Sequence, residues 1–66
     1  MRAIVNGAAR ELPDAVTVGA ALELLGSARE GVAVARNDRF VRRAEYDVET
    51  VAEGDRLEII EAVAGG

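Results

Sequence analysis

The N-terminal part of the chain alternates short apolar runs with residues that favour turns. Asn6-Gly7 separates two such runs, and both residues tolerate the positive φ angles of a type I′ turn, so the pair predicts a β-hairpin. We predict its strands over about residues 2–5 and 8–12. The second strand should stop before Pro13, because proline has no N–H to donate to a neighbouring strand.

The following segment has the spacing of an amphipathic helix. Its apolar residues recur at positions i, i+3, i+4 and i+7, namely Val18, Ala21, Leu22 and Leu25. Thr17 is a candidate N-cap, and Gly26 stands where a left-handed residue commonly ends a helix. We predict a helix over about residues 18–25. Gly19 destabilises it by about 1 kcal/mol relative to Ala, so the helix depends on packing against other elements.

The second half of the chain has the features of three further strands. We predict these strands over residues 32–36, 40–42 and 56–60, with turns at Asn37-Asp38 and Gly54-Asp55. The stretch Tyr46–Ala52 has no clear period, and we expect a loop there with room for a single helical turn. The predicted element order is therefore β-β-α-β-β-β.

Alternation along the third strand leaves two interpretations of its faces. If Arg36 faces solvent, Val32 and Val34 lie on the same side of the strand, while Ala33 and Ala35 face the helix. The valines would then form an open patch that a partner protein could bind. In the alternative, Arg36 extends its charge to solvent from the strand end and the valines belong to the core. The alternation alone does not decide between them.

Composition excludes most of the chemistry that the chain could perform alone. Its 66 residues suffice for one small domain, and the core must consist of Val, Leu, Ile and Ala because only 3% of the residues are aromatic. We expect Phe40 and Tyr46 to pack in the core or against loops. The chain has no Cys, His or Lys, so it lacks a thiol nucleophile, an imidazole base and a Schiff-base lysine. We therefore expect it not to be an enzyme.

Charge and hydropathy narrow the range of partners. A formal net charge of −4 makes nucleic acid a poor partner, and no apolar run approaches the roughly 20 residues that span a bilayer. The N-terminus lacks a signal-peptide pattern. The acidic residues Asp47, Glu49 and Glu53 lack the glycine and spacing of a calcium loop. We expect a cytoplasmic protein that binds no nucleic acid, membrane, metal or cofactor of its own.

The charged residues near the last two strands leave further alternatives open. Arg42 and Arg43 either pair with an acidic partner or form a solvated loop surface. Glu58 and Glu61 either meet a basic partner or keep the last strand from pairing with a neighbouring molecule.

The last five residues, Ala62–Gly66, are uncharged and end in two glycines. Glycine is costly to order and adds no packing, so Gly65-Gly66 brings nothing to the stability of a small fold. One interpretation is a frayed terminus of a single domain over residues 1–66. The other is a slim, flexible arm, about 62–66, that inserts a terminal carboxylate into a narrow slot of a partner enzyme. That enzyme would activate the carboxylate, for instance as an acyl-adenylate, for attack by a soft nucleophile such as sulfide.

Residues 31–66 contain a series of motifs in a characteristic order. They are Asn37, Phe40-Val41, Arg43, Tyr46, Gly54-Asp55, the apolar strand 56–60 and the final Gly-Gly. In this series the chain resembles the ThiS family of sulfur carrier proteins of thiamine biosynthesis. The resemblance implies an α+β fold of the β-grasp (ubiquitin-like) type, with a mixed sheet of four to five strands packed on one short helix.

The resemblance also implies a reaction cycle. A ThiF-like adenylating enzyme uses ATP to activate the carboxylate of Gly66, with Gly65 providing clearance beside it. A cysteine desulfurase supplies persulfide sulfur, which converts the carboxylate to a thiocarboxylate. A ThiG-like thiazole synthase then accepts the sulfur for the thiazole ring of thiamine. Candidate partner-binding residues are those of the arm and of the exposed sheet surface: Ala62, Val63, Ala64, Val32, Val34 and Arg43.

Other functions share this terminal motif. The small subunit of molybdopterin synthase, or a carrier for another sulfur-containing metabolite, would use the same tail chemistry. A ubiquitin-like modifier would instead be conjugated through Gly66 to lysines of target proteins. In a β-grasp interaction module the tail would have no role.

Overall fold

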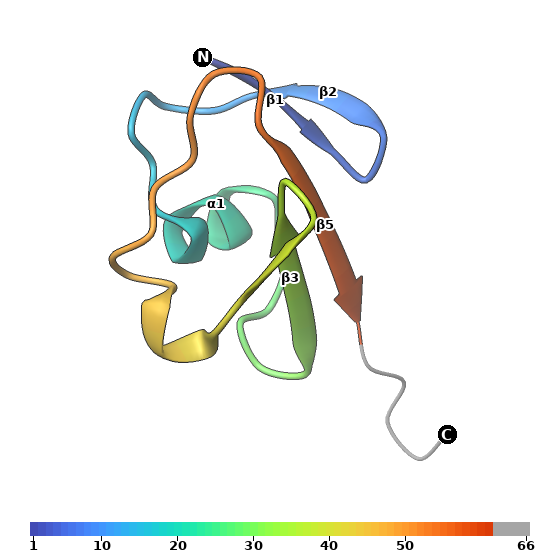
Figure 1. The fold of residues 1–66 in the computed structure, drawn as a ribbon, viewed down its shortest axis with the longest axis vertical. Coiled ribbons are helices and arrows are strands. Elements are labelled where there is room, and N and C mark those ends of the chain that lie inside the picture. The colour runs from blue at the N-terminus through green and yellow to red at the C-terminus, as the bar shows by residue number, and fades with distance from the viewer. Residues whose placement is uncertain (62–66) are drawn as a thin grey trace.

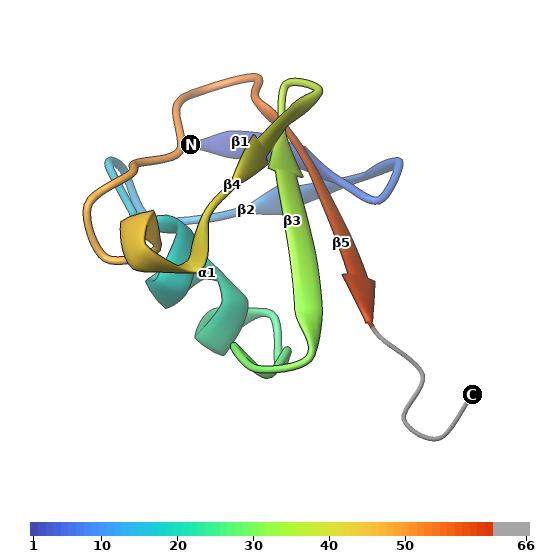
Figure 2. The same cartoon turned by 60° about the horizontal axis from the view of Figure 1, so that its bottom comes forward.

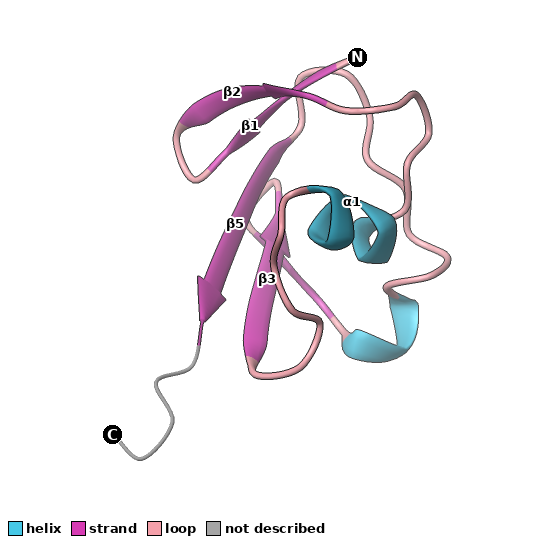
Figure 3. Cartoon of the chain, turned by 180° about the vertical axis from the view of Figure 1, so that it is seen from behind, coloured by secondary structure: helices cyan, strands magenta, loops and turns pink. Residues whose placement is uncertain are grey.

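The computed structural model describes residues 1–61, which form one mixed five-stranded sheet with a single α-helix on one face (Figure 1). The helix is seen end-on against the sheet when the molecule is viewed from behind (Figure 3). The elements are β1 (Arg2–Val5), β2 (Ala8–Glu11), α1 (Val18–Leu24), β3 (Val32–Arg36), β4 (Arg39–Val41), the 3₁₀ helix η1 (Arg43–Glu45) and β5 (Arg56–Glu61). The strand order across the sheet is β2-β1-β5-β3-β4.

The predicted hairpin is confirmed. β1 and β2 pair antiparallel, and the turn residues Asn6 and Gly7 have φ angles of 49° and 84°. β2 ends at Glu11, one residue earlier than predicted, and the next residue, Leu12, is buried in the core.

The helix has the predicted caps. The Thr17 hydroxyl accepts a hydrogen bond from the Ala20 N–H at 3.1 Å, and Gly26 is left-handed with φ 76°. Val18 and Leu22 are among the most fully buried side chains of the protein. Leu25, the last residue of the predicted stripe, is the C-cap and is half-buried.

β5 lies at the centre of the sheet, where it pairs parallel to β1 and antiparallel to β3. The chain between β1 and β5 contains the helix and the three remaining strands, β2, β3 and β4. Figure 2 shows β3 and β4 beside the helix and β5 running toward the C-terminus. β5 therefore has a paired strand on each side. Because β5 is not an edge strand of the sheet, the hypothesis that Glu58 keeps an edge strand from pairing with a neighbouring molecule does not hold for the strand as a whole.

The predicted positions of the fourth strand and of the single helical turn are wrong by a few residues. β4 covers Arg39–Val41 rather than 40–42, because Asn37 and Asp38 form a tight turn with φ angles of 52° and 68°. The single helical turn is η1, which precedes the stretch 46–52 where we expected it. That stretch contains an isolated bridge between Thr50 and Thr17 instead.

The structure decides between the two interpretations of β3. Val34 is 1% exposed and Val32 packs against the core, whereas Ala33 is exposed on the opposite face. The prediction that these valines form an open partner-binding patch is therefore wrong for Val34 and unsupported for Val32. Arg36 shares their face, but it lies at the strand end, where its side chain reaches acidic residues of a neighbouring loop.

The two aromatic residues behave differently. Tyr46 is 2% exposed and belongs to the core, as predicted. Phe40 is 70% exposed, so the expectation that it packs inside is wrong. Its neighbour Val41 takes the buried position, and alternation along β4 places Phe40 on the side of the sheet away from the helix.

Among residues 1–61, no helix has the length and apolar character needed to cross a membrane.

Candidate functional site: the outer end of β5

The predicted reactive residues Gly65 and Gly66 and the arm residues Ala62, Val63 and Ala64 lie outside the described residues. The structure does define the point from which they extend, which is the outer end of β5. Leu57 is buried, and the antiparallel ladder with β3 continues to the pair Val32–Glu61. β5 is therefore held by backbone pairing on its β3 side up to the last described residue.

On its other side, the outer end of β5 is held by one side chain. β1 stops at Val5, so its ladder with β5 ends at the pair Val5–Leu57. The side-chain amide of Asn6 then takes the place of a further β1 residue. Its Oδ1 accepts from the Ile59 N–H at 2.8 Å, and its Nδ2 donates to the Ile59 carbonyl at 3.2 Å. Asn6 thus extends the ladder by one residue while it also forms the hairpin turn.

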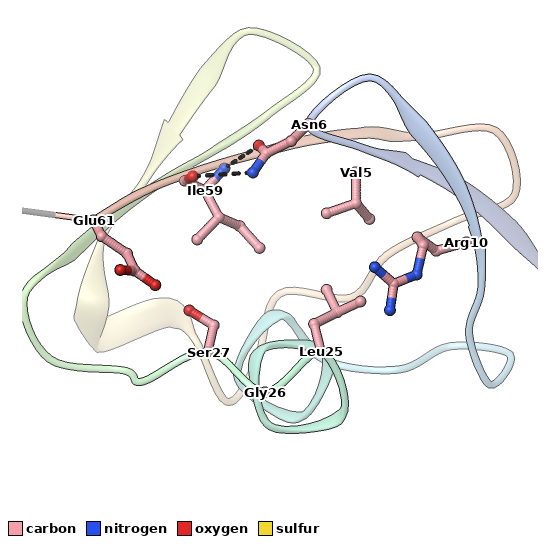
Figure 4. A pocket seen from close by; sticks show the side chains of 8 residues that line it. All are labelled: Val5, Asn6, Arg10, Leu25, Gly26, Ser27, Ile59 and Glu61. Atoms are coloured by element: carbon pink, nitrogen blue, oxygen red, sulfur yellow. Dashed lines mark hydrogen bonds between the residues drawn. The ribbon is translucent and has the colours of Figure 1, made fainter.

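A groove of about 300 Å³ lies beside this end of β5, on the helix side of the sheet (Figure 4). Val5, Leu25 and Ile59 supply its apolar surface. Arg10 and Glu61 line it as well, so a cation and a carboxylate border the apolar part. Arg10 makes no ion pair with any other residue of the described range.

The opposite face of the sheet carries an exposed apolar surface, which we call the open-face patch and define as Ala33, Ala35, Phe40 and Ile60. The strand registers place Ala33 opposite Ile60 and Ala35 opposite Phe40. Phe40 and Ile60 are 70% and 65% exposed. Because the side chains of the two alanines are small, the surface between Phe40 and Ile60 is shallow.

The sequence pattern left open which residues of β3 face solvent, and it placed Phe40 in the core or against loops, so it did not predict this patch. The available signal was the alternation Phe40-Val41, in which only one of two adjacent apolar residues of a strand can face the core.

The inner end of β5 is fixed by a buried carboxylate. Asp55 is 8% exposed and accepts hydrogen bonds from Arg36 Nε (2.9 Å), Asn37 Nδ2 (2.9 Å) and the Ala52 N–H (2.7 Å). Burial raises the pKa of this carboxyl, but the hydrogen bonds from Asn37 and Ala52 and the charge of Arg36 outweigh it, and the pKa lies below its ordinary value. The ionised Asp55 therefore joins the β3–β4 turn to the loop that leads into β5.

The predicted partner-binding residue Arg43 begins η1. Its Nη2 lies 3.5 Å from Glu30 Oε1, and both side chains are mostly exposed. Arg42 lies 3.6 Å from Glu45 in a similar exposed pair. Because exposed ion pairs of this kind are weak, both arginines are free to exchange these carboxylates for others, and a role for Arg43 in partner binding stays a prediction.

Known proteins resemble the chain over its whole length. The sequence model of the ThiS family matches residues 3–66. The crystal structure of the thiamine biosynthesis protein ThiS from Geobacter metallireducens superposes with a TM-score of 0.86 at 30% identity, covering all of both chains. The solution structure from the same organism gives a TM-score of 0.82 at 30% identity, covering this chain fully and 88% of the other.

A thiazole synthase of Paramagnetospirillum magneticum is 38% identical over 66 residues. The chain spans about one fifth of the length of that relative (20%), and all of this chain is matched. The family match extends through both terminal glycines, and the matched structures share the fold described above. The chain belongs to the ThiS family.

Proposed function

We propose that this protein is a sulfur carrier of thiamine synthesis whose Gly66 carboxylate is the reactive group. The observation that carries the proposal is the family match, which runs to residue 66 and so includes Gly65-Gly66. Two features of the described residues support it. β5 is a well-anchored strand that leads directly to the arm, and the chain has no thiol, imidazole or lysine with which to perform chemistry itself.

The proposed chemistry takes place on partner enzymes. A carboxylate oxygen of Gly66 attacks the α-phosphate of ATP on a ThiF-like enzyme and releases pyrophosphate. The terminal sulfur of a persulfide, formed by a cysteine desulfurase, attacks the acyl carbon and releases AMP. A second thiol then cleaves the S–S bond and leaves a thiocarboxylate on Gly66. The carrier is a co-substrate in this scheme, and ATP and the persulfide belong to its partners.

The open-face patch is the proposed docking surface for the adenylating enzyme. Ile60 belongs to this patch and lies one residue before Glu61, the last described residue. An enzyme that holds residues 62–66 in its active site must therefore also lie close to Ile60. Exposed apolar surface beside the arm is what such a contact would bury.

The acceptor of the sulfur is proposed to be a ThiG-like thiazole synthase. The support is the relative from Paramagnetospirillum magneticum, which bears that name and contains a stretch matching this entire chain. That protein therefore combines, in one polypeptide, a region similar to this chain and a further four fifths of sequence that this chain lacks.

Intact-protein mass spectrometry tests the proposal. The purified chain is incubated with ATP, a ThiF-like enzyme, a cysteine desulfurase and cysteine. We expect a mass increase equal to the difference between one sulfur and one oxygen atom. Deletion of Gly66 should abolish the increase while the thermal unfolding curve stays the same, because a glycine has no side chain to pack in the core. Sulfur incorporation into the truncated chain would contradict the proposal.

Adding candidate acceptors to the same incubation, namely other proteins, a molybdopterin precursor or a thiazole synthase with its substrates, separates the alternative functions. A product in which Gly66 is joined to a lysine of another protein would indicate a ubiquitin-like modifier. Sulfur transfer to a molybdopterin precursor, with none to the thiazole, would indicate the small-subunit role in molybdopterin synthase.

A further inference from the structure

The two turns that join neighbouring antiparallel strands have a similar backbone but different sequences. Asn6-Gly7 joins β1 to β2 with φ angles of 49° and 84°, and Asn37-Asp38 joins β3 to β4 with φ angles of 52° and 68°. Asn6 and Asn37 are the two asparagines of the chain, which has no glutamine. Loss of ammonia from a side-chain amide must therefore occur at one of these two residues.

The first turn leaves the nucleophile for this reaction free. The backbone nitrogen of the following residue attacks the side-chain carbonyl carbon of asparagine, and glycine hinders the attack least because it has no side chain. The N–H of Gly7 donates no hydrogen bond within residues 1–61, and a Cβ atom at this position would meet nothing within 4 Å. Asn37 is followed by Asp38 instead, whose side chain crowds the same attack.

Two hydrogen bonds fix the side chain of Asn6 on the neighbouring strand. Its Oδ1 accepts from the Ile59 N–H at 2.8 Å, and its Nδ2 donates to the Ile59 carbonyl at 3.2 Å (Figure 4). Attack by the Gly7 nitrogen closes a five-membered ring over the backbone of Asn6. In that geometry the amide cannot also bind both backbone groups of Ile59, so this pairing must open before the ring forms.

Water has access to Asn6 from both faces of the sheet. The residue is exposed and lines the groove on the helix side. It also lines a second hollow of about 340 Å³ on the opposite face, beside Ile4, Arg56 and Glu58. The pairing with Ile59, rather than burial, therefore limits the reaction of this side chain.

We infer that Asn6 is a site of spontaneous deamidation, that its pairing with Ile59 slows the reaction in the folded chain, and that the product loosens the outer end of β5. The Gly7 nitrogen loses its proton and forms a bond to Cγ of Asn6, the bond from Cγ to Nδ2 breaks, and ammonia leaves with that proton. Water then opens the resulting succinimide ring at either carbonyl, which gives aspartate or isoaspartate at position 6.

Both products lack the donor that Asn6 provides. A carboxylate has no N–H with which to bind the Ile59 carbonyl, and it places oxygen beside that oxygen. Isoaspartate also adds one carbon atom to the backbone of a two-residue turn. The ladder between β3 and β5 does not involve position 6, so the fold should persist while β5 loses its support on the β1 side.

Incubation of the whole chain in mildly alkaline buffer tests the inference, with tandem mass spectrometry to locate the change. Replacement of NH by O should accumulate at Asn6, several-fold more slowly than in a free peptide with the sequence of residues 2–11, while Asn37 stays unmodified. Faster modification of Asn37, equal rates in the folded chain and the peptide, or no conversion of the folded chain when the peptide has fully reacted would each overturn the inference.

Gly7→Asp is the matched variant, because it gives the first turn the sequence of the second. Asp38 already occupies the same turn position with a positive φ angle. Conversion at Asn6 should fall at least several-fold, both in the folded variant and in the corresponding peptide, where folding has no influence. An unchanged rate in the variant peptide would show that the residue at position 7 does not control the attack, and would overturn the inference.

The deamidated chain carries one more negative charge, so ion exchange separates it for study. In this product the Ile59 amide should exchange with deuterium several-fold faster than in the unmodified chain. The Ile4 amide, which donates to the Asp55 carbonyl at 2.8 Å, should change little. Equal exchange at Ile59 before and after deamidation would overturn the inference that the product loosens this end of β5.

Discussion

Gly19 lies in the first turn of α1 beneath the guanidinium of Arg29. A Cβ atom at position 19 would lie 2.5 Å from Arg29 Nη2 and 3.0 Å from Asp47 Oδ1. Without that atom, Arg29 reaches across the helix to donate to Asp47 at 2.7 Å and to Glu23 at 3.3 Å. Glycine at position 19 costs about 1 kcal/mol in helix propensity relative to Ala. It also leaves room for the guanidinium of Arg29, whose ion pairs join the helix to two loops. Sequence reasoning identified the cost but not the arrangement, since the partners are distant in the chain.

Asp55 gives a pH-dependent prediction at the scale of one residue. Asp55→Asn places an amide among three donors and should lower the free energy of unfolding by about 1.5 to 3 kcal/mol at pH 7. Because the pKa of Asp55 is lowered in the folded state, its contribution is complete above the unfolded-state pKa of about 3.9 and is lost as the pH falls through the lower folded-state pKa. Urea unfolding at pH 7 and at progressively lower pH measures both effects.

The control for this prediction is Asp38→Asn, which removes a carboxylate that is 68% exposed and pairs only with Arg56. We expect less than about 1 kcal/mol for it. A pH profile that is the same for Asp55→Asn and the unaltered chain would show that Asp55 does not stabilise the fold through its charge.

At the scale of the elements, β3 shows how far the sequence predicts the structure. Its bounds were predicted correctly because Val, Ala and turn residues mark a strand locally. Its orientation was left open because Arg36 can be satisfied on either face. Asp55 and Glu49, which pair with Arg36, lie 19 and 13 residues away in the sequence, and no local pattern shows that they meet.

The faces of β3 can be tested by a pair of substitutions. Val34→Ala should lower the free energy of unfolding by about 2 kcal/mol, since it removes two buried methyl groups. Ala33→Ser, on the exposed face, should change it by less than about 0.5 kcal/mol. Chemical denaturation of both variants makes the comparison. A larger effect at position 33 than at position 34 would restore the interpretation in which the valines face outward.

The outer end of β5 depends on the side chain of Asn6, which gives a second prediction at this scale. Asn6→Gly retains a residue suited to φ 49° but removes both hydrogen bonds to Ile59. The Ile59 amide should then exchange with deuterium at least several-fold faster, while the Ile4 amide, whose N–H still donates to the Asp55 carbonyl in the same ladder, should change little. Amide exchange followed by NMR distinguishes the two sites. Unchanged protection of Ile59 would mean that the β3 ladder alone holds β5.

At the scale of the whole molecule, the outer end of β5 has an exposed apolar surface on one face of the sheet and, on the other face, a groove bordered by Arg10 and Glu61. The fold class was predictable because short motifs indicate it, whereas the role of Gly65-Gly66 stays a prediction. The open-face patch was not predictable, because it is assembled from β3, β4 and β5, whose registers no sequence pattern specifies. Phe40 and Ile60 are 20 residues apart in the chain, yet both project from one face of the sheet.

The open-face patch predicts a binding defect. Phe40→Ser and Ile60→Ser should each weaken the complex with the adenylating enzyme by about tenfold, the loss typical of a central apolar contact, with little effect on folding. Val48→Ser is the control, because Val48 is 73% exposed but lies outside the patch. Isothermal titration calorimetry supplies the affinities. Equal affinities for all three variants and the unaltered chain would exclude the patch from the interface.

The central claim is that the carboxylate of Gly66 carries the sulfur. Its most direct measurement is tandem mass spectrometry of the chain isolated from its own cells, with fragmentation that locates any mass change along the sequence. We predict a population in which sulfur replaces one oxygen and the change maps to Gly66. A native chain that continues beyond residue 66 and is never trimmed, or one in which sulfur is carried at any other position, would contradict the account.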